Sequence, residues 1–352
     1  MSKALPELMN ILWLKDTKTG HLHKAKGLLR ALSDKAAISI TECDVQWRWS
    51  GLRAVLPRLG PWTMRLPLHW LFKNIPNLSG CDMILSAGGA TQWLNAAIAY
   101  QHKITNVFLG SPRGMDVSLF SCIAFHDAPI AVDPCYRFTI IPSLVTPQGA
   151  ALAARQCKLP ESSAWGLLFG GDGEGIVWTK EEYRKITQSF LKAAAHQGVK
   201  VAIATSRRTP PAIEAMVREL AASSGRLEVS CWYHNRSPDA PPLLAMLGGC
   251  SRLYVTADSM SMTHEAVSSG RPVYVILPPS GGNTRLLANL SQLQKEKHIL
   301  LQQSSDMIDQ ANAVPEGNWN IIEKDPTAAL AAAVFDVYGR HVQQQKSAIH
   351  IA

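Results

Sequence analysis

Short apolar runs alternate along this chain with longer stretches in which apolar residues recur at helical spacing. The first run, residues 11–14, precedes a stretch in which Leu22, Leu28 and Leu32 would lie on one helix face. An apolar run of this length is typical of a buried strand, and the leucine spacing is typical of an amphipathic helix. Because strands that alternate with helices favour mostly parallel sheets, the pattern predicts an α/β protein.

The alternation is interrupted near the middle of the chain. Residues 145–163 contain Pro147, Gly149 and Pro160, and we predict that they link two Rossmann-like α/β domains that face a cleft. The domains would be residues 1–150 and residues 151–352, and 352 residues suffice for two domains of ordinary size. Strands are predicted at residues 11–14, 38–41, 82–86, 105–109, 120–125 and 137–141, and then at 165–169, 199–204, 227–232, 253–256 and 273–276.

The stretch of residues 253–276 is the most informative part of the sequence. It predicts a strand, a tight turn, a helix that Ser259 or Ser261 caps and Gly270 ends, and a second strand. A helix that opens at a strand end presents unpaired N–H groups and a positive dipole end, which suits phosphate or ribose. Glu265 could accept hydrogen bonds from a diol held there, although an ordinary βαβ unit with a solvent-facing glutamate is the commoner case.

A glycine-rich turn follows the predicted strand 165–169. Gly170 and Gly171 would let backbone amides approach a diphosphate or a sugar. Thr179 and Glu182 have the spacing of a capping box, so the next helix begins after the glycines and the turn is not a P-loop.

Two arginines follow the predicted strand 199–204. Ser206, Arg207 and Arg208 precede a helix that begins with proline, and arginine pairs at such a place suit phosphate binding. Ordinary surface charge is the alternative, but a position at the carboxyl edge of a parallel sheet favours binding. We also expect a loop after residue 276 that carries Asn283 and Arg285, and a terminal helix at residues 327–338.

Candidate chemistry in the first domain is less distinct. Gly20 and His21 lie in the first strand-to-helix turn, which lacks the Gly-x-Gly-x-x-Gly pattern, so we infer no NAD site. From the residues alone, His21 is a polar residue on the first helical turn. Arg113 follows another strand and should lie at the same carboxyl edge. The adjacent residues 126 and 127, His and Asp, form either a polarised acid–base pair or a plain loop.

The composition indicates a globular, cytoplasmic protein with an anionic partner. The net charge of +8 favours nucleotide diphosphate, acidic lipid or nucleic acid as that partner. No apolar run reaches the ~18 residues of a membrane span, and the N-terminus lacks the layout of a signal peptide. The seven cysteines are scattered, which implies reduced thiols and no structural zinc. No Asp-x-Asp motif occurs, and we expect no metal.

Residues 45–81 contain no Asp or Glu. They contain tryptophans and cations, namely Trp47, Trp49, Trp62, Trp70, Arg48, Arg53, Arg58, Arg65 and Lys73. Indoles among cations fit a surface that meets the headgroups of an anionic membrane. Packing of the indoles in the core is an equal alternative. Nucleic acid is a third, but no known nucleic-acid-binding motif supports it, so we expect no such partner.

Three motifs together resemble one family. The motifs are Gly-Gly-Asp-Gly at 170–173, Thr-Ser-Arg-Arg-Thr-Pro-Pro at 205–211, and the Ser/Thr-rich turn with Glu-Ala at 256–266. The last resembles the nucleotide-binding signature of GT-B glycosyltransferases. As a set they are most similar to the bacterial proteins named after the ELM-type mitochondrial fission factor of plants, a GT-B-like group, and the similarity covers about residues 10 to 300.

The resemblance implies a metal-independent glycosyltransferase without a cofactor. It places a nucleotide-sugar on the second domain and a lipid-linked or envelope saccharide acceptor on the first. Apart from the resemblance, the N-terminus and residues 45–81 predict a cytoplasmic protein that is peripheral on the inner face of the membrane. Glu265 would hold the ribose, and His21 is a candidate base or acceptor contact, although its turn departs from a glycine-rich loop. Diphosphate or base contacts would come from Gly170, Gly171, Ser206, Arg207, Arg208, Ser259, Met260 and Ser261.

Two other functions remain open. A scaffold protein could keep the fold without catalysis, as the fission connection of the plant relatives allows. A nonhydrolysing sugar-nucleotide epimerase shares the two-domain layout and needs carboxylates on both sides of the bond it breaks. Its candidate carboxylates are Asp16, Asp127, Asp172 and Glu174, which form no recognisable constellation in the sequence.

Overall fold

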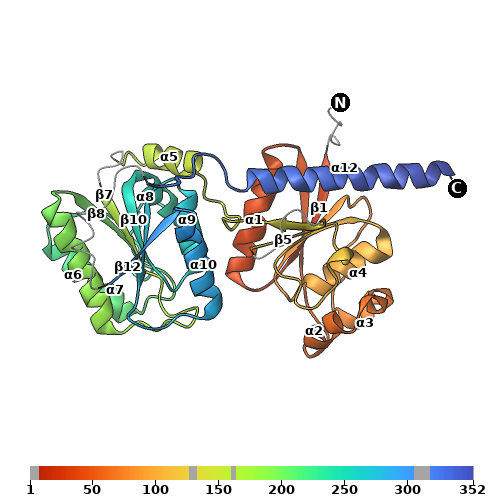
Figure 1. Cartoon of the computed structure of the whole chain (residues 1–352), viewed down its shortest axis with the longest axis horizontal. Helices are drawn as coiled ribbons and strands as arrows, with labels where there is room; N and C mark the ends of the chain where they lie inside the picture. The colour runs from red at the N-terminus through yellow and green to blue at the C-terminus, as the bar shows by residue number, and fades with distance from the viewer. Residues whose placement is uncertain (1–7, 127–132, 160–163, 305–317, 352) are drawn as a thin grey trace. The chain divides into compact units, whose positions relative to one another are not determined.

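The chain folds into two compact units, each built on a six-stranded parallel sheet with helices packed beside it (Figure 1). The computed structural model describes residues 8–126, 133–159, 164–304 and 318–351. The first unit comprises Met1–Leu144 together with Pro326–Ala352, and the second comprises Val145–Asp325. This architecture confirms the predicted α/β class with two Rossmann-like units.

The first sheet has the strand order β2-β1-β3-β4-β5-β6. Its strands are β1 (Met9–Lys15), β2 (Ile38–Asp44), β3 (Met83–Ala87), β4 (Thr105–Leu109), β5 (Cys122–Phe125) and β6 (Cys135–Arg137). The helices of this unit are α1 (Thr19–Ser33), α2 (Leu52–Val55), η1 (Leu56–Arg58), η2 (Pro61–Arg65), α3 (Leu68–Leu71), α4 (Gln92–His102), η3 (Val117–Leu119) and α12 (Ala328–Ile351).

The inner strands β1, β3 and β4 of the first sheet are covered on both faces, which is why they read as continuous apolar runs. Successive strand residues point to opposite faces. Ile11 therefore packs with α1 and α12 in one core cluster, whereas its neighbour Leu12 packs with α4 in the other. The α12 residues Leu330, Val334 and Phe335 complete the first of these clusters.

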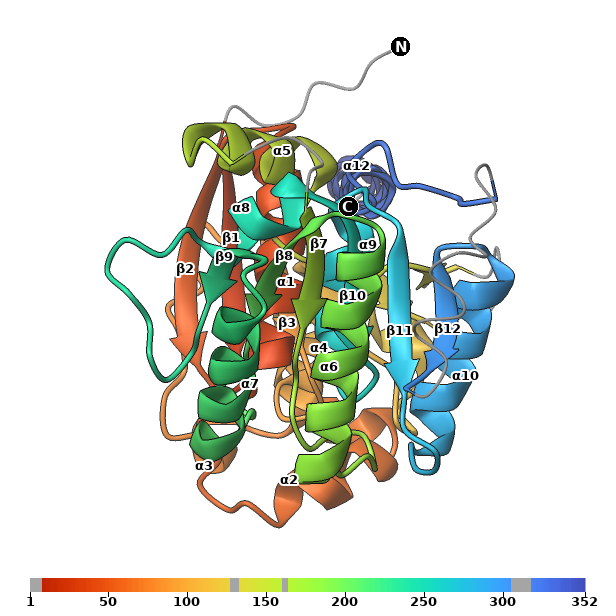
Figure 2. The ribbon, with the colours of Figure 1, turned by 90° about the vertical axis from the view of Figure 1, so that its left-hand side faces the viewer.

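The second sheet has the strand order β12-β11-β10-β7-β8-β9. Its strands are β7 (Ala164–Leu168), β8 (Lys200–Ala204), β9 (Leu227–Cys231), β10 (Cys250–Thr256), β11 (Val273–Leu277) and β12 (Ile299–Gln303). The helices are α5 (Pro147–Gln156), α6 (Lys180–His196), α7 (Pro211–Ser223), α8 (Leu243–Gly249), α9 (Met260–Ser268) and α10 (Thr284–Lys295). Figure 2 shows α6 and α7 side by side over one face of this sheet. Because β7 pairs with β10, the loops that follow these two strands meet at one edge.

The division of the chain differs from the predicted one in its last part. We expected residues 151–352 to form the second domain, but α12 packs against α1 and β4 of the first unit. Within the predicted link, Pro147 instead begins α5, because proline suits the first helical position and the Thr146 hydroxyl accepts from Gly149 N–H at 3.0 Å.

Three further elements differ from the sequence-based expectation. The predicted loop after residue 276 ends at Asn283, whose side chain accepts from Leu286 N–H at 2.8 Å and starts α10. The strand expected at 137–141 lies at Cys135–Arg137. Strand β12 was not predicted.

Candidate functional site

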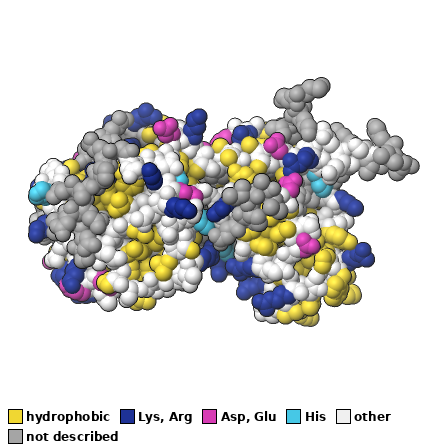
Figure 3. Space-filling view, viewed as in Figure 1, with side chains coloured by type: hydrophobic (Ala, Val, Ile, Leu, Met, Phe, Trp, Pro, Cys, Tyr) yellow, Lys and Arg dark blue, Asp and Glu magenta, His cyan; other side chains and the backbone are white. Residues whose placement is uncertain are grey.

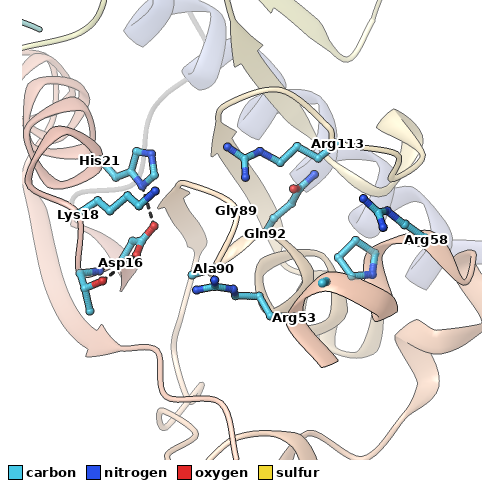
Figure 4. Close-up of a pocket in the computed structure, with 12 residues that line it drawn as sticks. Asp16, Lys18, His21, Arg53, Arg58, Gly89, Ala90, Gln92 and Arg113 are labelled. Carbon is cyan, nitrogen blue, oxygen red and sulfur yellow. Dashed lines mark hydrogen bonds and ion pairs between the residues drawn. The ribbon is translucent and has the colours of Figure 1, made fainter. Parts of the chain in front are cut away.

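A cavity of about 280 Å³ lies at the carboxyl edge of the first sheet (Figure 4). The loops after β1, β3 and β4 contribute to its wall, because the carboxyl ends of parallel strands lie at one edge. The other lining residues come from the first turn of α1, the start of α4 and the short α2–η1 segment. The lining residues are Asp16, Thr17, Lys18, His21, Arg53, Ala54, Pro57, Arg58, Gly89, Ala90, Gln92 and Arg113.

Asp16 and His21 form a hydrogen-bonded pair in this pocket. His21 Nδ1 lies 2.6 Å from Asp16 Oδ2, and the other carboxylate oxygen accepts from Thr17 N–H at 2.6 Å. The pair sits against Gly88, where a Cβ atom would lie 2.0 Å from His21 Nδ1. Gly88 also has a φ of +91°, a conformation that favours glycine. A larger residue at position 88 would therefore displace the histidine.

The surroundings of this pair set its protonation state. The pKa of His21 is lowered: burial is the largest cause, Lys24 and Lys18 add to it, and the hydrogen bond and charge of Asp16 offset only part of this lowering. Burial acts to raise the pKa of Asp16, but hydrogen bonds from His21 and backbone N–H groups outweigh it and leave that pKa lowered. At neutral pH the imidazole is therefore neutral beside an ionised carboxylate. Its Nδ1–H donates to Asp16, which leaves Nε2 as a proton acceptor.

Four cations surround the same pocket, namely Lys18, Arg53, Arg58 and Arg113, which come from separate loops and short helices (Figure 4). Among the described residues, no carboxylate lies within ion-pair distance of any of them. The sequence placed Arg113 at this edge, but it did not indicate that Arg53 and Arg58 converge with it. The sequence feature that could have indicated this convergence is the lack of Asp and Glu in residues 45–81.

The three motifs of the second unit converge on Asp258. This carboxylate is fully buried. It accepts hydrogen bonds from Gly171 N–H at 2.9 Å, from Trp178 Nε1–H at 2.9 Å and from Arg208 Nη2 at 3.0 Å. Burial raises the pKa of Asp258, and these donors act against that rise. From the sequence, this residue is predicted only to belong to the tight turn after strand 253–256.

The glycines of the second unit make room for this cluster. A Cβ atom on Gly170 would lie 1.9 Å from Asp258 Oδ2, and one on Gly173 would lie 2.0 Å from Arg208 Nη1. The Ser206 hydroxyl and the Thr209 hydroxyl both donate to the Gly170 carbonyl oxygen. The glycine-rich turn is thus packed tightly against the turn that carries the arginines.

The predicted site residues of this unit differ in accessibility. Arg208 is engaged by Asp258 and by the Asp172 carbonyl oxygen. Arg207 is exposed, and its side chain has no hydrogen-bond or ion-pair partner within the described ranges. Ser259 caps α9 by accepting from Met262 N–H at 3.4 Å. The other predicted residues on α9 are Met260, which is buried, Ser261, which is exposed, and Glu265, which is half-buried in the second turn.

The adjacent residues 126 and 127 are a further pair predicted from the sequence. His126 Nδ1 lies 3.3 Å from the Phe138 carbonyl oxygen, and Asp127 lies outside the described residues. Among the described residues, no group of three or more His, Cys, Asp or Glu side chains is arranged to hold a metal ion. The described helices include none that is both long enough and apolar enough to cross a membrane.

The tryptophans of 45–81 separate into two groups. Trp47 packs on Phe72 with ring centroids 4.3 Å apart, and its Nε1–H donates to the Ala90 carbonyl oxygen at 2.9 Å. Trp49, Trp62 and Trp70 are 52%, 63% and 66% exposed. Figure 3 shows hydrophobic and basic side chains together over the α2–α3 part of the first unit. We call this region, residues 49–73, the tryptophan surface.

Comparisons with known proteins agree with the fold. The model of the family described as mitochondrial fission ELM1 matches residues 19–338. An uncharacterized protein of Rickettsia prowazekii is 24% identical over 153 residues, and the match spans 42% of this chain and 42% of that relative.

Solved structures with a similar fold include enzymes of sugar-nucleotide chemistry. UDP-GlcNAc 2-epimerase of Methanocaldococcus jannaschii has a TM-score of 0.55 at 12% identity, over 94% of this chain and 98% of that chain. MurG of Acinetobacter baumannii has a TM-score of 0.51 at 13% identity, over 95% and 99%. UDP-GlcNAc 2-epimerase of Neisseria meningitidis, solved with UDP-GlcNAc, has a TM-score of 0.51 at 15% identity, over 95% and 100%.

The hydrogen bonds that Asp258 accepts from Gly171, Trp178 and Arg208 lead to a prediction about stability. Arg208→Ala would leave a buried carboxylate without its cation, and we expect it to lower the free energy of unfolding by about 2 to 3 kcal/mol. The adjacent Arg207→Ala removes the same charge from an exposed position and should change it by less than about 0.5 kcal/mol. Urea unfolding of both variants measures the difference. Equal stability of the two variants would show that Arg208 does not stabilise the buried carboxylate.

Proposed function

This chain belongs to the mitochondrial fission ELM1 family, and we propose that it is a metal-independent glycosyltransferase. It would transfer a sugar from a nucleotide-sugar to a lipid-linked or envelope saccharide. The observation that carries this proposal is the Asp16–His21 pair, whose neutral imidazole opens on a pocket at the carboxyl edge of the first sheet. The fold shared with MurG and with UDP-GlcNAc 2-epimerases supports the class of reaction.

We assign the role of general base to His21. Its Nε2 would take the proton of an acceptor hydroxyl while that oxygen forms a bond to the anomeric carbon of the donor sugar. The bond from the anomeric carbon to the diphosphate breaks, and the nucleoside diphosphate leaves. Asp16 would hold the imidazole in the required tautomer and stabilise the imidazolium that forms.

We assign donor binding to the second unit. The N-terminus of α9 and the exposed Arg207 would contact the diphosphate, and Ser261 lies in the same first helical turn. Glu265 would accept from the ribose hydroxyls. Gly170, Gly171, Ser206 and Arg208 would support these contacts by fixing the loops around Asp258. The Neisseria epimerase was solved with UDP-GlcNAc, which supports a nucleotide-sugar as the ligand class.

We further propose that the tryptophan surface docks on an anionic membrane. Three exposed indoles lie among Arg53, Arg58 and Lys73, which are also exposed, and this combination suits the headgroup region of acidic lipid. The protein would then work at the inner face of the membrane, where a lipid-linked acceptor would be available.

Simple measurements separate glycosyl transfer from the two alternative functions, an epimerase and a scaffold without catalysis. An epimerase would convert a UDP-sugar without any acceptor, and the fold similarity to UDP-GlcNAc 2-epimerases keeps that test relevant. Asp16, one of its candidate carboxylates, is paired with His21. A scaffold without catalysis should show no thermal shift with any nucleoside diphosphate.

The pH dependence of transfer tests the role of His21. Burial holds its pKa below the ordinary value of 6.5, and a base must be unprotonated, so kcat/KM should rise with pH through this lowered pKa and level off above it. Asp16 raises the pKa of His21, so Asp16→Asn should move this acidic limb to lower pH. His21→Ala should lose about 100-fold or more in kcat.

The assay follows release of nucleoside diphosphate from the donor that a mass-spectrometric binding screen identifies. His102→Ala alters an exposed histidine outside the pocket and is the control. An acidic limb that stays unchanged in Asp16→Asn would contradict the assignment of the base.

The role of Glu265 can be tested with nucleotides that lack the ribose hydroxyls. Glu265→Gln should weaken binding of a ribonucleoside diphosphate, because an amide replaces only part of the double acceptor. The loss should shrink with the 2′,3′-dideoxy analogue. Calorimetry with both ligands measures this difference, and Glu219→Gln on the exposed face of α7 is the matched control. An equal loss with both nucleotides would argue against a ribose contact.

Sedimentation with liposomes tests the tryptophan surface. The protein should pellet with anionic vesicles and leave them at 1 M salt, where the Debye length falls to ~3 Å. Replacement of both Trp62 and Trp70 by alanine should weaken this binding, whereas Tyr233→Ala, at an exposed aromatic of the second unit, should not. Equal binding to neutral and anionic vesicles would exclude an electrostatic contribution to membrane binding. No binding to either kind of vesicle would refute the membrane proposal.

A further inference from the structure

We propose that the first-unit pocket binds a phosphate or diphosphate group, and that the acceptor is therefore a phosphorylated molecule. The step from anion to acceptor rests on the proposed glycosyl transfer, whereas the anion site itself does not. The ligand chemistry is that of a phosphate ester, which a lipid headgroup or a water-soluble metabolite could supply.

The charges around the pocket call for an anion. Lys18, Arg113 and the pair Arg53 and Arg58 come from three places in the chain and surround one space of about 280 Å³ (Figure 4). One lining carboxylate, Asp16, is already hydrogen-bonded to His21. Cations gathered in this way repel one another, and a bound polyanion converts that repulsion into attraction.

Local structure holds Arg113 at the pocket at a conformational cost. Its φ is +48°, in the left-handed region that residues other than glycine rarely adopt. A Cβ atom on Gly89 would lie 2.8 Å from Arg113 Nη1, so a larger residue there would require the guanidinium to shift. The Gln92 side chain donates to the Pro112 carbonyl oxygen and fixes the same loop. The Arg113 backbone is strained, and residues near Gly89 and Gln92 pack around its loop, which is expected of a preformed binding site.

The pocket chemistry favours phosphate over a neutral sugar or a single carboxylate. The guanidinium group presents a planar fork of donors that matches phosphate oxygens. Three arginines and a lysine offer far more charge than one carboxylate could neutralise. A neutral saccharide would leave all four charges uncompensated.

The location of the pocket associates the phosphate with the acceptor. The cations share one cavity with His21, the proposed base, whereas the proposed nucleotide contacts belong to the second unit. Arg53 and Arg58 lie between the exposed Trp49 and Trp62 in the sequence. The segment that supplies two of the four pocket cations therefore also supplies the tryptophan surface, as an acceptor phosphate attached to lipid would require.

Calorimetry on the full-length protein tests the site. The chain is first saturated with UDP, so that any nucleotide site is filled, and is then titrated with inorganic pyrophosphate. Arg53→Ala and Arg113→Ala should each weaken pyrophosphate binding about tenfold or more, since each removes charge-assisted hydrogen bonds. Lys26→Ala removes one exposed charge of the same unit outside the pocket and should change binding less than about twofold. Arg113→Gly, which suits the left-handed φ, replaces the alanine variant if that one unfolds.

The outcomes separate this inference from the proposed function. Pocket variants that lose pyrophosphate but bind UDP like the wild type support the inference. If the wild type binds pyrophosphate in the pocket but binds no nucleoside diphosphate of any base, the anion site stands and the proposed glycosyl transfer fails. If Arg53→Ala and Arg113→Ala bind pyrophosphate no more weakly than Lys26→Ala, the inference is overturned. Glucuronate is a sugar that carries a single carboxylate. If it binds as tightly as pyrophosphate, the pocket does not select phosphate.

A second pair of probes identifies the source of the phosphate. Glycerol 3-phosphate represents a soluble ester, and dihexanoyl phosphatidic acid represents the same group on a lipid. Tighter binding of the lipid, with the gain lost when Trp62 and Trp70 are both replaced by alanine, supports a lipid-linked acceptor. Equal binding of both supports a soluble phosphorylated acceptor. Binding of neither would overturn the site.

Discussion

The second unit depends on a charge buried at the edge of its sheet. A carboxylate without water is costly unless donors surround it, and Asp258 receives them from a glycine amide, an indole and a guanidinium. The donors belong to two loops, the one after β7 with Gly171 and Trp178 and the one after β8 with Arg208, and Asp258 itself lies in a third loop far along the chain. Satisfying one carboxylate therefore fixes the relative positions of the loops, and the glycines are needed because no Cβ atom fits around it.

The first unit also places a carboxylate just after a central strand, with a different result. Asp16 shares its hydrogen bonds with a histidine and a backbone amide, and the pair borders a cavity. The carboxylate of the second unit is closed off and stabilises structure, whereas Asp16 orients a group that can still exchange a proton. Both units thus place a carboxylate at the carboxyl edge of a parallel sheet, and the difference lies in the access of the Asp16–His21 pair to the pocket.

The parts of the structure that depend on neighbouring residues were predictable from the sequence. The capping box of Thr179 and Glu182 and the cap at Ser259 are confirmed, because such contacts span three residues. The buried strands were found because both faces of a parallel sheet are covered. Interactions between distant residues were not predictable: nothing near Arg208 in the sequence indicates that its partner is Asp258. The convergence of Arg53 with Arg113, and the packing of α12 on the first unit, were missed for the same reason.

The path of the chain through its two units has a consequence for biosynthesis. The first unit is left at Leu144 and is resumed at Pro326, so the second unit is an insertion within the first. During translation, residues 145–325 are complete before Leu330, Val334 and Phe335 leave the ribosome and fill one core cluster of the first unit. The inserted unit can therefore reach its native state while the earlier unit still exposes an unfilled apolar face. Nascent chains stalled before residue 330 should be the species that chaperones recognise.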